Sequence, residues 1–225
     1  MSKNTWVRMH ALGMLAALLA LWQGGYWLPL LIFPVAAFSI LTVQHLPALR
    51  RLRPPGGYAN WVTTARLGLL LYAAWAYPRW HPYLTFGLFL VVIISDGIDG
   101  YLARKHNQAT AFGSMLDIET DALMSALLAG IHYQLGKAGG WILLAGGLRY
   151  AFIWAIYVFK LEGQAGAGHR YARLIGVVFI SSLMGPFVAP DWLAVPAMVL
   201  GSLLAVYSFG LSFWQVWRNA RTRSS

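Results

Sequence analysis

Most of the acidic side chains in this sequence lie close together. Of seven Asp and Glu residues in 225, five fall within 26 positions, and these are Asp96, Asp99, Asp117, Glu119 and Asp121. Grouped carboxylates repel one another unless cations join them. Carboxylate oxygens are ligands that Mg²⁺ prefers, and Mg²⁺ completes its shell with substrate phosphates. The stretch therefore predicts a site for one or two divalent cations, and Arg104 and Lys105 beside it favour a diphosphate substrate.

Helical spacing places these residues on two faces. At about 100° per residue, one helix face carries two carboxylates and two very small residues, namely Asp96, Asp99, Gly100 and Ala103. On the next helix Gly113, Asp117 and Asp121 share a face, and Glu119 points away from it. Because residues 105–110 form only a short connection, the two helices should be antiparallel neighbours with converging acidic faces.

Zinc chemistry does not fit the remaining residues. The chain has no cysteine, so it offers neither a disulfide nor a thiolate ligand. Its six histidines are dispersed and form no H-E-x-x-H motif. Oxygen ligands and a hard cation are the better interpretation.

The elements that position this cluster are membrane helices. The sequence is 59% hydrophobic and 11% charged, whereas soluble domains carry about 25% charged residues. Several apolar runs approach the roughly 20 residues that cross a bilayer, and they do not alternate as barrel strands do. We predict an all-α integral membrane protein with eight spans at about 6–23, 27–44, 60–77, 83–104, 111–134, 140–160, 172–189 and 193–217.

The basic residues predict the orientation of these spans. With alternating spans, fourteen of the seventeen Lys and Arg residues fall on one side, Arg79 and Lys137 fall on the other, and Arg149 lies within a span. The positive-inside rule then predicts cytoplasmic termini in a cell (inner) membrane, with the acidic site near the cytoplasmic face. Because this placement also accounts for the net charge of +10, no nucleic-acid partner is expected.

The positions of proline- and glycine-rich segments suggest that the chain has four parts. We expect two N-terminal transmembrane helices in 1–45, a basic Pro/Gly linker in 46–59 and a six-helix catalytic membrane domain in 60–217. A basic cytoplasmic tail follows in 218–225.

The acidic stretch resembles a known signature. Residues Asp96 to Asp121 follow D-x2-D-G-x2-A-R-x8-G-x3-D-x3-D at every specified position, which is the pattern of the CDP-alcohol phosphotransferase family. Upstream, Asn60, Thr63 and Arg66 resemble the N-x2-T-x2-R segment of that family's first core helix. The proline that often precedes this asparagine is here Ala59.

The resemblance implies a chemistry and a set of roles. Asp96, Asp99, Asp117 and Asp121 would hold two divalent cations, Mg²⁺ or Mn²⁺, and Asp121 would also be the general base. The donor would be CDP-diacylglycerol or a similar CDP-alcohol, and CMP would leave. The residues expected around the nucleotide are Asn60, Thr63, Arg66, Gly100, Ala103, Arg104 and Gly113. For Arg66 a positive-inside anchor is an equal alternative, and a homodimer is implied by the family alone.

The acceptor is less defined by the sequence. A cation within a span needs an anionic partner, and Arg149 falls where the family's fourth core helix carries an arginine facing the site. With His169, Arg170 and Arg173 it would bind a phosphorylated acceptor such as glycerol 3-phosphate or inositol phosphate. His169 and Arg170 are equally well interpreted as interfacial anchors. An unphosphorylated acceptor (serine, choline or phosphatidylglycerol) stays open.

A cation transporter is the alternative from a different class. Carboxylates inside a membrane can carry an ion. Transporters, however, tend to contain internal repeats and helices broken at the midplane. The sequence has no evident repeat, and its acids lie near one membrane face beside Arg104. The enzyme is therefore the favoured hypothesis.

Overall fold

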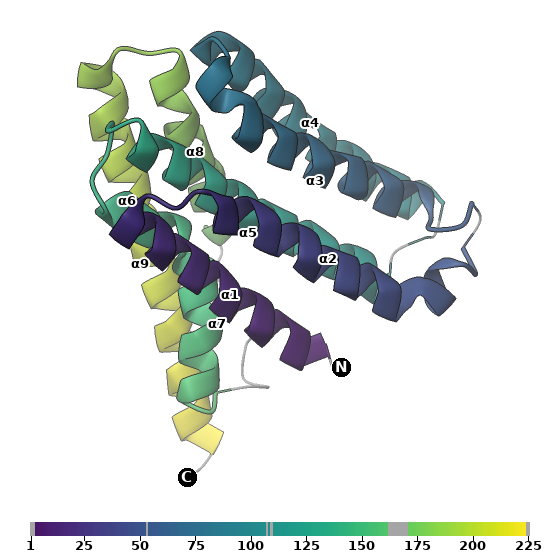
Figure 1. Ribbon diagram of the computed structural model, residues 1–225. Coiled ribbons are helices and arrows are strands. Elements are labelled where there is room, and N and C mark those ends of the chain that lie inside the picture. Colours follow the sequence, from purple (N-terminus) through teal and green to yellow (C-terminus); the bar gives the residue numbers. More distant parts are fainter. Residues whose placement is uncertain (1–2, 53, 107, 109, 162–170, 224–225) are drawn as a thin grey trace.

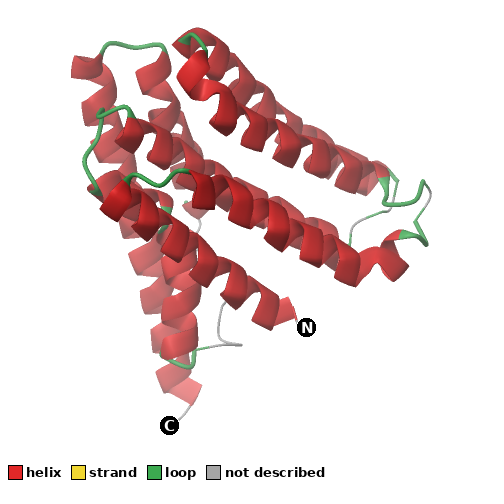
Figure 2. Ribbon diagram, in the orientation of Figure 1, coloured by secondary structure: helices red, strands yellow, loops and turns green. Residues whose placement is uncertain are grey.

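The computed structural model describes residues 3–52, 54–106, 108, 110–161 and 171–223. Within these ranges the regular secondary structure is entirely helical (Figure 2). The long helices are α1 (Lys3–Gly24), α2 (Leu28–Leu49), α3 (Tyr58–Ala76), α4 (Pro82–Lys105), α5 (Ala111–Gln134) and α9 (Asp191–Arg223). The shorter helices are η1 (Tyr77–Arg79), α6 (Trp141–Gly146), α7 (Leu148–Val158), α8 (Ala172–Met184) and η2 (Gly185–Phe187).

The outer surface is that of a membrane protein. Large apolar side chains such as Ile94, Leu144 and Leu200 are more than half exposed, which a water-facing surface rarely tolerates over wide areas. Four helices are long and apolar enough to cross a membrane, and they cover Asn4–Gly24, Leu28–Leu49, Pro82–Lys105 and Asp191–Arg221. The prediction of an all-helical membrane protein is confirmed, and the count of eight spans stays a prediction.

The connections gather at two opposite ends of the bundle (Figure 1). The turns that follow α1, η1, α5 and η2 lie at one end. Both termini, the α2–α3 linker and the α4–α5 connection lie at the other end. Arg79 and Lys137, the two residues expected opposite the main basic group, belong to turns of the first end.

Helix α5 is the centre of the fold. Fifteen of its 24 residues are buried, and Leu123, Leu127 and Ile131 are fully buried. Its last turn holds the α1–α2 turn, because Tyr133 Oη donates to the Trp22 carbonyl at 3.1 Å and Gln134 Nε2 donates to the Gly25 carbonyl at 2.9 Å. A side chain on α5 is therefore fixed against several helices at once.

The structure differs from the expected helix bounds in several places, and α9 continues to Arg223, beyond the expected end at residue 217. The expected span 140–160 is divided into α6 and α7 at Gly147, since two adjacent glycines favour a helix poorly. These glycines also allow close packing: a Cβ on Gly146 would lie 2.5 Å from Ala129 Cβ, and one on Gly147 would lie 3.0 Å from Leu18 Cδ1. Helix α2 continues through Pro47 to Leu49, beyond the expected end at residue 44.

Candidate active site: an acidic cluster shared by three helices

The N-terminus of α3 is set by a tight glycine turn. Gly56 and Gly57 have φ values of 91° and 78°, a region that other residues rarely adopt. Asn60 Nδ2 donates to the Gly56 carbonyl at 2.7 Å and fixes the first turn of α3. A Cβ on Gly113 of α5 would lie 2.5 Å from Asn60 Oδ1. Glycine at position 113 therefore lets α3 and α5 meet closely at this end.

Arg66 of α3 joins carboxylates from two other helices. Its side chain is 1% exposed and pairs with Asp96 of α4. It also reaches Asp117 Oδ1 at 2.5 Å and Asp121 Oδ1 at 3.5 Å on α5. One carboxylate oxygen from each of these three aspartates lies within 4.8 Å of the others. Three helices thus bring together residues that are up to 55 positions apart in the chain.

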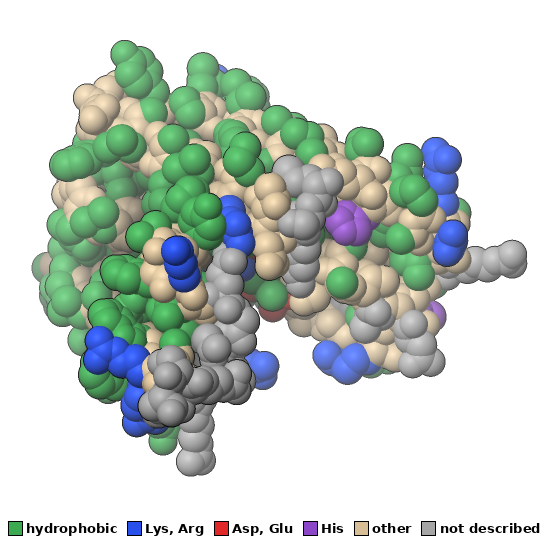
Figure 3. Space-filling view, turned by 90° about the horizontal axis from the view of Figure 1, so that it is seen from below, with side chains coloured by type: hydrophobic (Ala, Val, Ile, Leu, Met, Phe, Trp, Pro, Cys, Tyr) green, Lys and Arg blue, Asp and Glu red, His purple; other side chains and the backbone are tan. Residues whose placement is uncertain are grey.

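The cluster is open to water and keeps a negative excess. The side chains of Asp96, Asp117 and Asp121 are 49%, 39% and 52% exposed, and acidic atoms reach the surface in a hollow at the end where both termini lie (Figure 3). Among the described side chains of the cluster, three carboxylates against one guanidinium leave two negative charges, which one divalent cation would neutralise. Convergent oxygen atoms of this kind fit a hard divalent cation.

The other predicted nucleotide residues lie on the helices that carry this cluster. Thr63 is buried one turn before Arg66. Gly100, Ala103 and Arg104 lie on the last two turns of α4, and a Cβ on Gly100 would approach Arg104 Nη1 only to 3.4 Å. Asp99 lies in α4 one turn beyond Asp96, and its side chain is outside the described part of the chain.

The connection between the two acidic helices is held from both sides. Gln108 Oε1 accepts a 2.9 Å hydrogen bond from the Tyr58 amide, which ties the connection to α3. Thr110 caps α5, since its Oγ1 accepts a 3.0 Å hydrogen bond from the Gly113 amide. The acidic faces are therefore positioned by local capping as well as by Arg66.

The four predicted acceptor residues lie in different parts of the chain. Arg149 lies on α7 and pairs with Glu119 of α5 at 2.5 Å. Arg173 is exposed in the first turn of α8. His169 and Arg170 lie outside the described residues. Of the four predicted acceptor residues, the described chain therefore contains two, on two different helices.

Sequence reasoning missed the partners of Glu119. This side chain is fully buried and bonds to His10 of α1 at 3.1 Å as well as to Arg149. Glu119 was expected to point away from the aspartates, and the carboxyl oxygens that converge do not include it. An ionised group within a membrane helix needs a partner, and that rule alone could have paired Glu119 with Arg149. Nothing in the local pattern pointed to His10.

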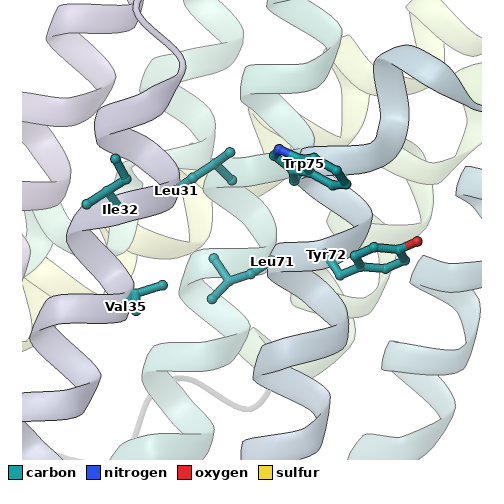
Figure 4. A pocket seen from close by; sticks show the side chains of 6 residues that line it. All are labelled: Leu31, Ile32, Val35, Leu71, Tyr72 and Trp75. Atoms are coloured by element: carbon teal, nitrogen blue, oxygen red, sulfur yellow. The ribbon is translucent and has the colours of Figure 1, made fainter.

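A second hollow in the structure lacks the charged groups that phosphoryl transfer needs. A groove of about 370 Å³ lies between α2 and α3 (Figure 4). The side chains along it are all apolar or aromatic, and they are Leu31, Ile32, Val35, Leu71, Tyr72 and Trp75. No charged group lines it, so the acidic cluster is the candidate active site.

Comparison with known proteins assigns this arrangement to a family. Residues 57–214, which are more than half of the chain, match the family model "CDP-alcohol phosphatidyltransferase". The chain belongs to the CDP-alcohol phosphatidyltransferase family. It is a phosphatidyltransferase, and the matched region contains the whole acidic cluster. Helices α1 and α2 precede the matched region.

Three similar proteins carry the same name. A CDP-diacylglycerol–glycerol-3-phosphate 3-phosphatidyltransferase of Yersinia enterocolitica is 29% identical over 169 residues, which cover 71% of this chain and 90% of that protein. A protein of the same name from Yersinia pestis is 28% identical over the same shares. One from Escherichia coli is 38% identical over 58 residues, which cover 24% of this chain and 32% of that protein.

Proposed function

We propose that this phosphatidyltransferase moves the phosphatidyl group of CDP-diacylglycerol to a hydroxyl of glycerol 3-phosphate and releases CMP. The observation that carries the proposal is the meeting of Asp96, Asp117 and Asp121 oxygens within 4.8 Å around the buried Arg66. The names of the similar Yersinia and Escherichia proteins support both substrates.

The reaction exchanges one phosphorus–oxygen bond for another. The acceptor hydroxyl oxygen attacks the β-phosphorus, which carries the lipid. The bond from that phosphorus to the bridging oxygen breaks, and CMP leaves with the bridging oxygen. The proton of the attacking hydroxyl passes to Asp121, whose carboxylate is half exposed and can meet an incoming hydroxyl.

Two divalent cations, Mg²⁺ or Mn²⁺, complete the proposed donor site. Asp96, Asp99, Asp117 and Asp121 would hold them. When bound, such cations neutralise the diphosphate and polarise the phosphoryl group that is transferred. The convergent oxygens and the negative excess of the cluster support this assignment.

The remaining donor residues orient the nucleotide. Asn60, Thr63 and Arg66 lie along one side of α3, and Arg104 with the small residues Gly100 and Ala103 lies at the end of α4. Arg66 already contacts three carboxylates. Its proposed role is to hold the aspartates in register and to share the negative charge of the diphosphate.

Arg149 and Arg173 would bind the phosphate of the acceptor, together with His169 and Arg170. Arginine matches phosphate geometry with several donors in a rigid fork. Arg149 uses Nη2 for Glu119, and its buried Nε has no hydrogen-bond partner within the described chain. The partial exposure of this side chain (32%) supports a role in binding an anionic ligand.

We place the active site at the cytoplasmic face of a cell (inner) membrane, with both termini on that side, eight spans and a homodimeric assembly. The basic residues support the orientation, because Arg50, Arg51, Lys105 and Arg218 lie toward the end that holds the termini. CDP-diacylglycerol would then enter from the cytoplasmic leaflet.

The test is CMP release by purified protein in detergent–lipid micelles. CDP-diacylglycerol is supplied with Mg²⁺ or Mn²⁺, and the acceptors are glycerol 3-phosphate, inositol phosphate, serine, choline and phosphatidylglycerol. We expect release with glycerol 3-phosphate and its loss when EDTA is present. Release with a different acceptor alone would reassign the substrate, and no release with any of them would overturn the proposal.

A further inference from the structure

Glu119 lies on a face of α5 that the catalytic cluster does not use. It is two residues from both Asp117 and Asp121, so it points about 160–200° away from them around the helix. The side chain is 0% exposed. Its Oε1 accepts a hydrogen bond from Arg149 Nη2 at 2.5 Å, and its Oε2 lies 3.1 Å from His10 Nδ1. Each carboxylate oxygen therefore has a different partner, from a different helix.

His10 is fixed by aromatic rings. It stacks on Trp6 at 4.8 Å and on Phe33 at 5.9 Å between ring centroids. The rings of Phe38 and Tyr150 meet it edge-on at 5.3 and 5.7 Å. Since an ionised carboxylate only accepts hydrogen bonds, Nδ1 of His10 must carry the proton that it shares with Glu119. The donor is thus held in one direction.

The carboxylate that Arg149 binds is itself fixed by His10. A free carboxylate and a guanidinium favour a bidentate pair that uses two parallel hydrogen bonds. In this structure Arg149 makes one hydrogen bond to Glu119, from Nη2 to Oε1, while Oε2 accepts from His10 Nδ1. Its Nε has no partner in the described chain, and the side chain is 32% exposed. The part-exposed guanidinium of Arg149 is therefore held from one side by Glu119.

We propose that His10 and Glu119 are positioning residues for the acceptor, and that α1 is thereby a working part of the transferase. His10 fixes the carboxylate of Glu119, and Glu119 holds the guanidinium of Arg149 in place for the acceptor phosphate. This inference rests on the proposed function, in which Arg149 binds that phosphate. Helix α1 lies outside the matched family region, so His10 is not part of the matched core.

Two substitutions of His10 separate its hydrogen bond from its packing. His10→Phe keeps an aromatic ring between Trp6 and Phe33 and removes the donor. His10→Asn loses the ring but places an amide N–H close to the position of Nδ1. We expect His10→Phe to raise the Michaelis constant for glycerol 3-phosphate about tenfold, which corresponds to about 1.4 kcal/mol. His10→Asn should stay within about threefold of the wild type, and in both variants kcat and the Michaelis constant for CDP-diacylglycerol should change little.

A double-variant cycle tests whether His10 acts through Arg149. Arg149→Gln should itself raise the Michaelis constant for glycerol 3-phosphate, and adding His10→Phe should then have no further effect. Asp191→Asn is the matched control, because it breaks the exposed 2.5 Å pair with Lys137 at the other end of the bundle. A structural effect alone would lower kcat and thermal stability in His10→Phe and would add to Arg149→Gln, which would overturn the inference.

The inference and the proposed function can fail separately. If wild-type protein releases CMP with glycerol 3-phosphate and Arg149→Gln weakens that acceptor, an unchanged Michaelis constant in His10→Phe overturns the inference alone. If wild-type protein does not use glycerol 3-phosphate, both are overturned.

Discussion

Arg66 Nη2 lies 2.5 Å from Asp117 Oδ1 on α5, and the same guanidinium pairs with Asp96 on α4. A buried cation thus stands where a catalytic cation would also be attracted. Arg66 and a divalent ion must share or compete for the same carboxylates. The aspartates are held together even before metal or substrate adds its charge.

Removal of the Arg66 charge should make the thermal stability of the protein depend more strongly on Mg²⁺. In Arg66→Gln the aspartates repel one another without compensation, so we expect the melting temperature to fall by several degrees, since about 1 kcal/mol corresponds to roughly 2–4 °C for a chain of this size. Mg²⁺ should then raise the melting temperature of Arg66→Gln more than that of wild type. The measurement is thermal unfolding in detergent over a Mg²⁺ titration.

The control for this variant is Arg79→Gln. Arg79 lies at the opposite end of the bundle, over the ring of Trp75, and should respond to Mg²⁺ as wild type does. Equal Mg²⁺ shifts in Arg66→Gln and wild type would show that Arg66 and the cation do not share ligands.

Much of the acidic cluster could be predicted from local spacing. Asp117 and Asp121 are four residues apart and therefore share a helix face, and the short connection before them returns the chain to Asp96. The structure brings these three together. Their catalytic roles, and those of the nucleotide and acceptor residues, stay predictions until the variants are measured.

The contacts that cross between distant segments could not be predicted in this way. His10 and Glu119 are 109 positions apart, and no periodic pattern relates them. Arg66 was predicted to bind the nucleotide or to anchor its helix at the membrane, and its pairs with Asp96 and Asp117 were not predicted. The close approach of Leu18 of α1 to Gly147 is likewise a contact that a hydropathy pattern does not contain.

Asp121→Asn should remove the general base and leave the fold intact. The substitution keeps the shape and loses the proton acceptor, so we expect kcat for CMP release to fall by about 10²–10⁴. Because Asp121 lies 3.5 Å from Arg66 and is 52% exposed, the melting temperature should change little. Asp191→Asn, at the other end of the bundle, is the control with the same chemical change. Near-normal turnover in Asp121→Asn would assign the base elsewhere.

Gly113→Ala should separate α3 from α5. Its new Cβ would lie 2.5 Å from Asn60 Oδ1 and 3.2 Å from Thr110 Oγ1, so either α3 or the Asn60 side chain must move. We expect a loss of about 1–3 kcal/mol in stability and a lower kcat as Arg66 shifts with α3. Gly176→Ala on α8 is the control, since no atom lies within 4 Å of its added Cβ. Equal melting temperatures for Gly113→Ala and Gly176→Ala would show that the close approach at Gly113 does not contribute to stability.

Arg173→Ala should weaken binding of the acceptor and leave binding of the donor unchanged. Arg173 is exposed at the start of α8, so its loss leaves no buried charge and should not unfold the protein. We expect the Michaelis constant for glycerol 3-phosphate to rise about tenfold, because a charge-assisted hydrogen bond contributes about 1.5–3 kcal/mol. The Michaelis constant for CDP-diacylglycerol should stay within about twofold. Arg50→Ala, an exposed arginine that follows α2, controls for the general loss of a surface cation. A change in CDP-diacylglycerol affinity alone would move Arg173 from the acceptor to the donor side of the site.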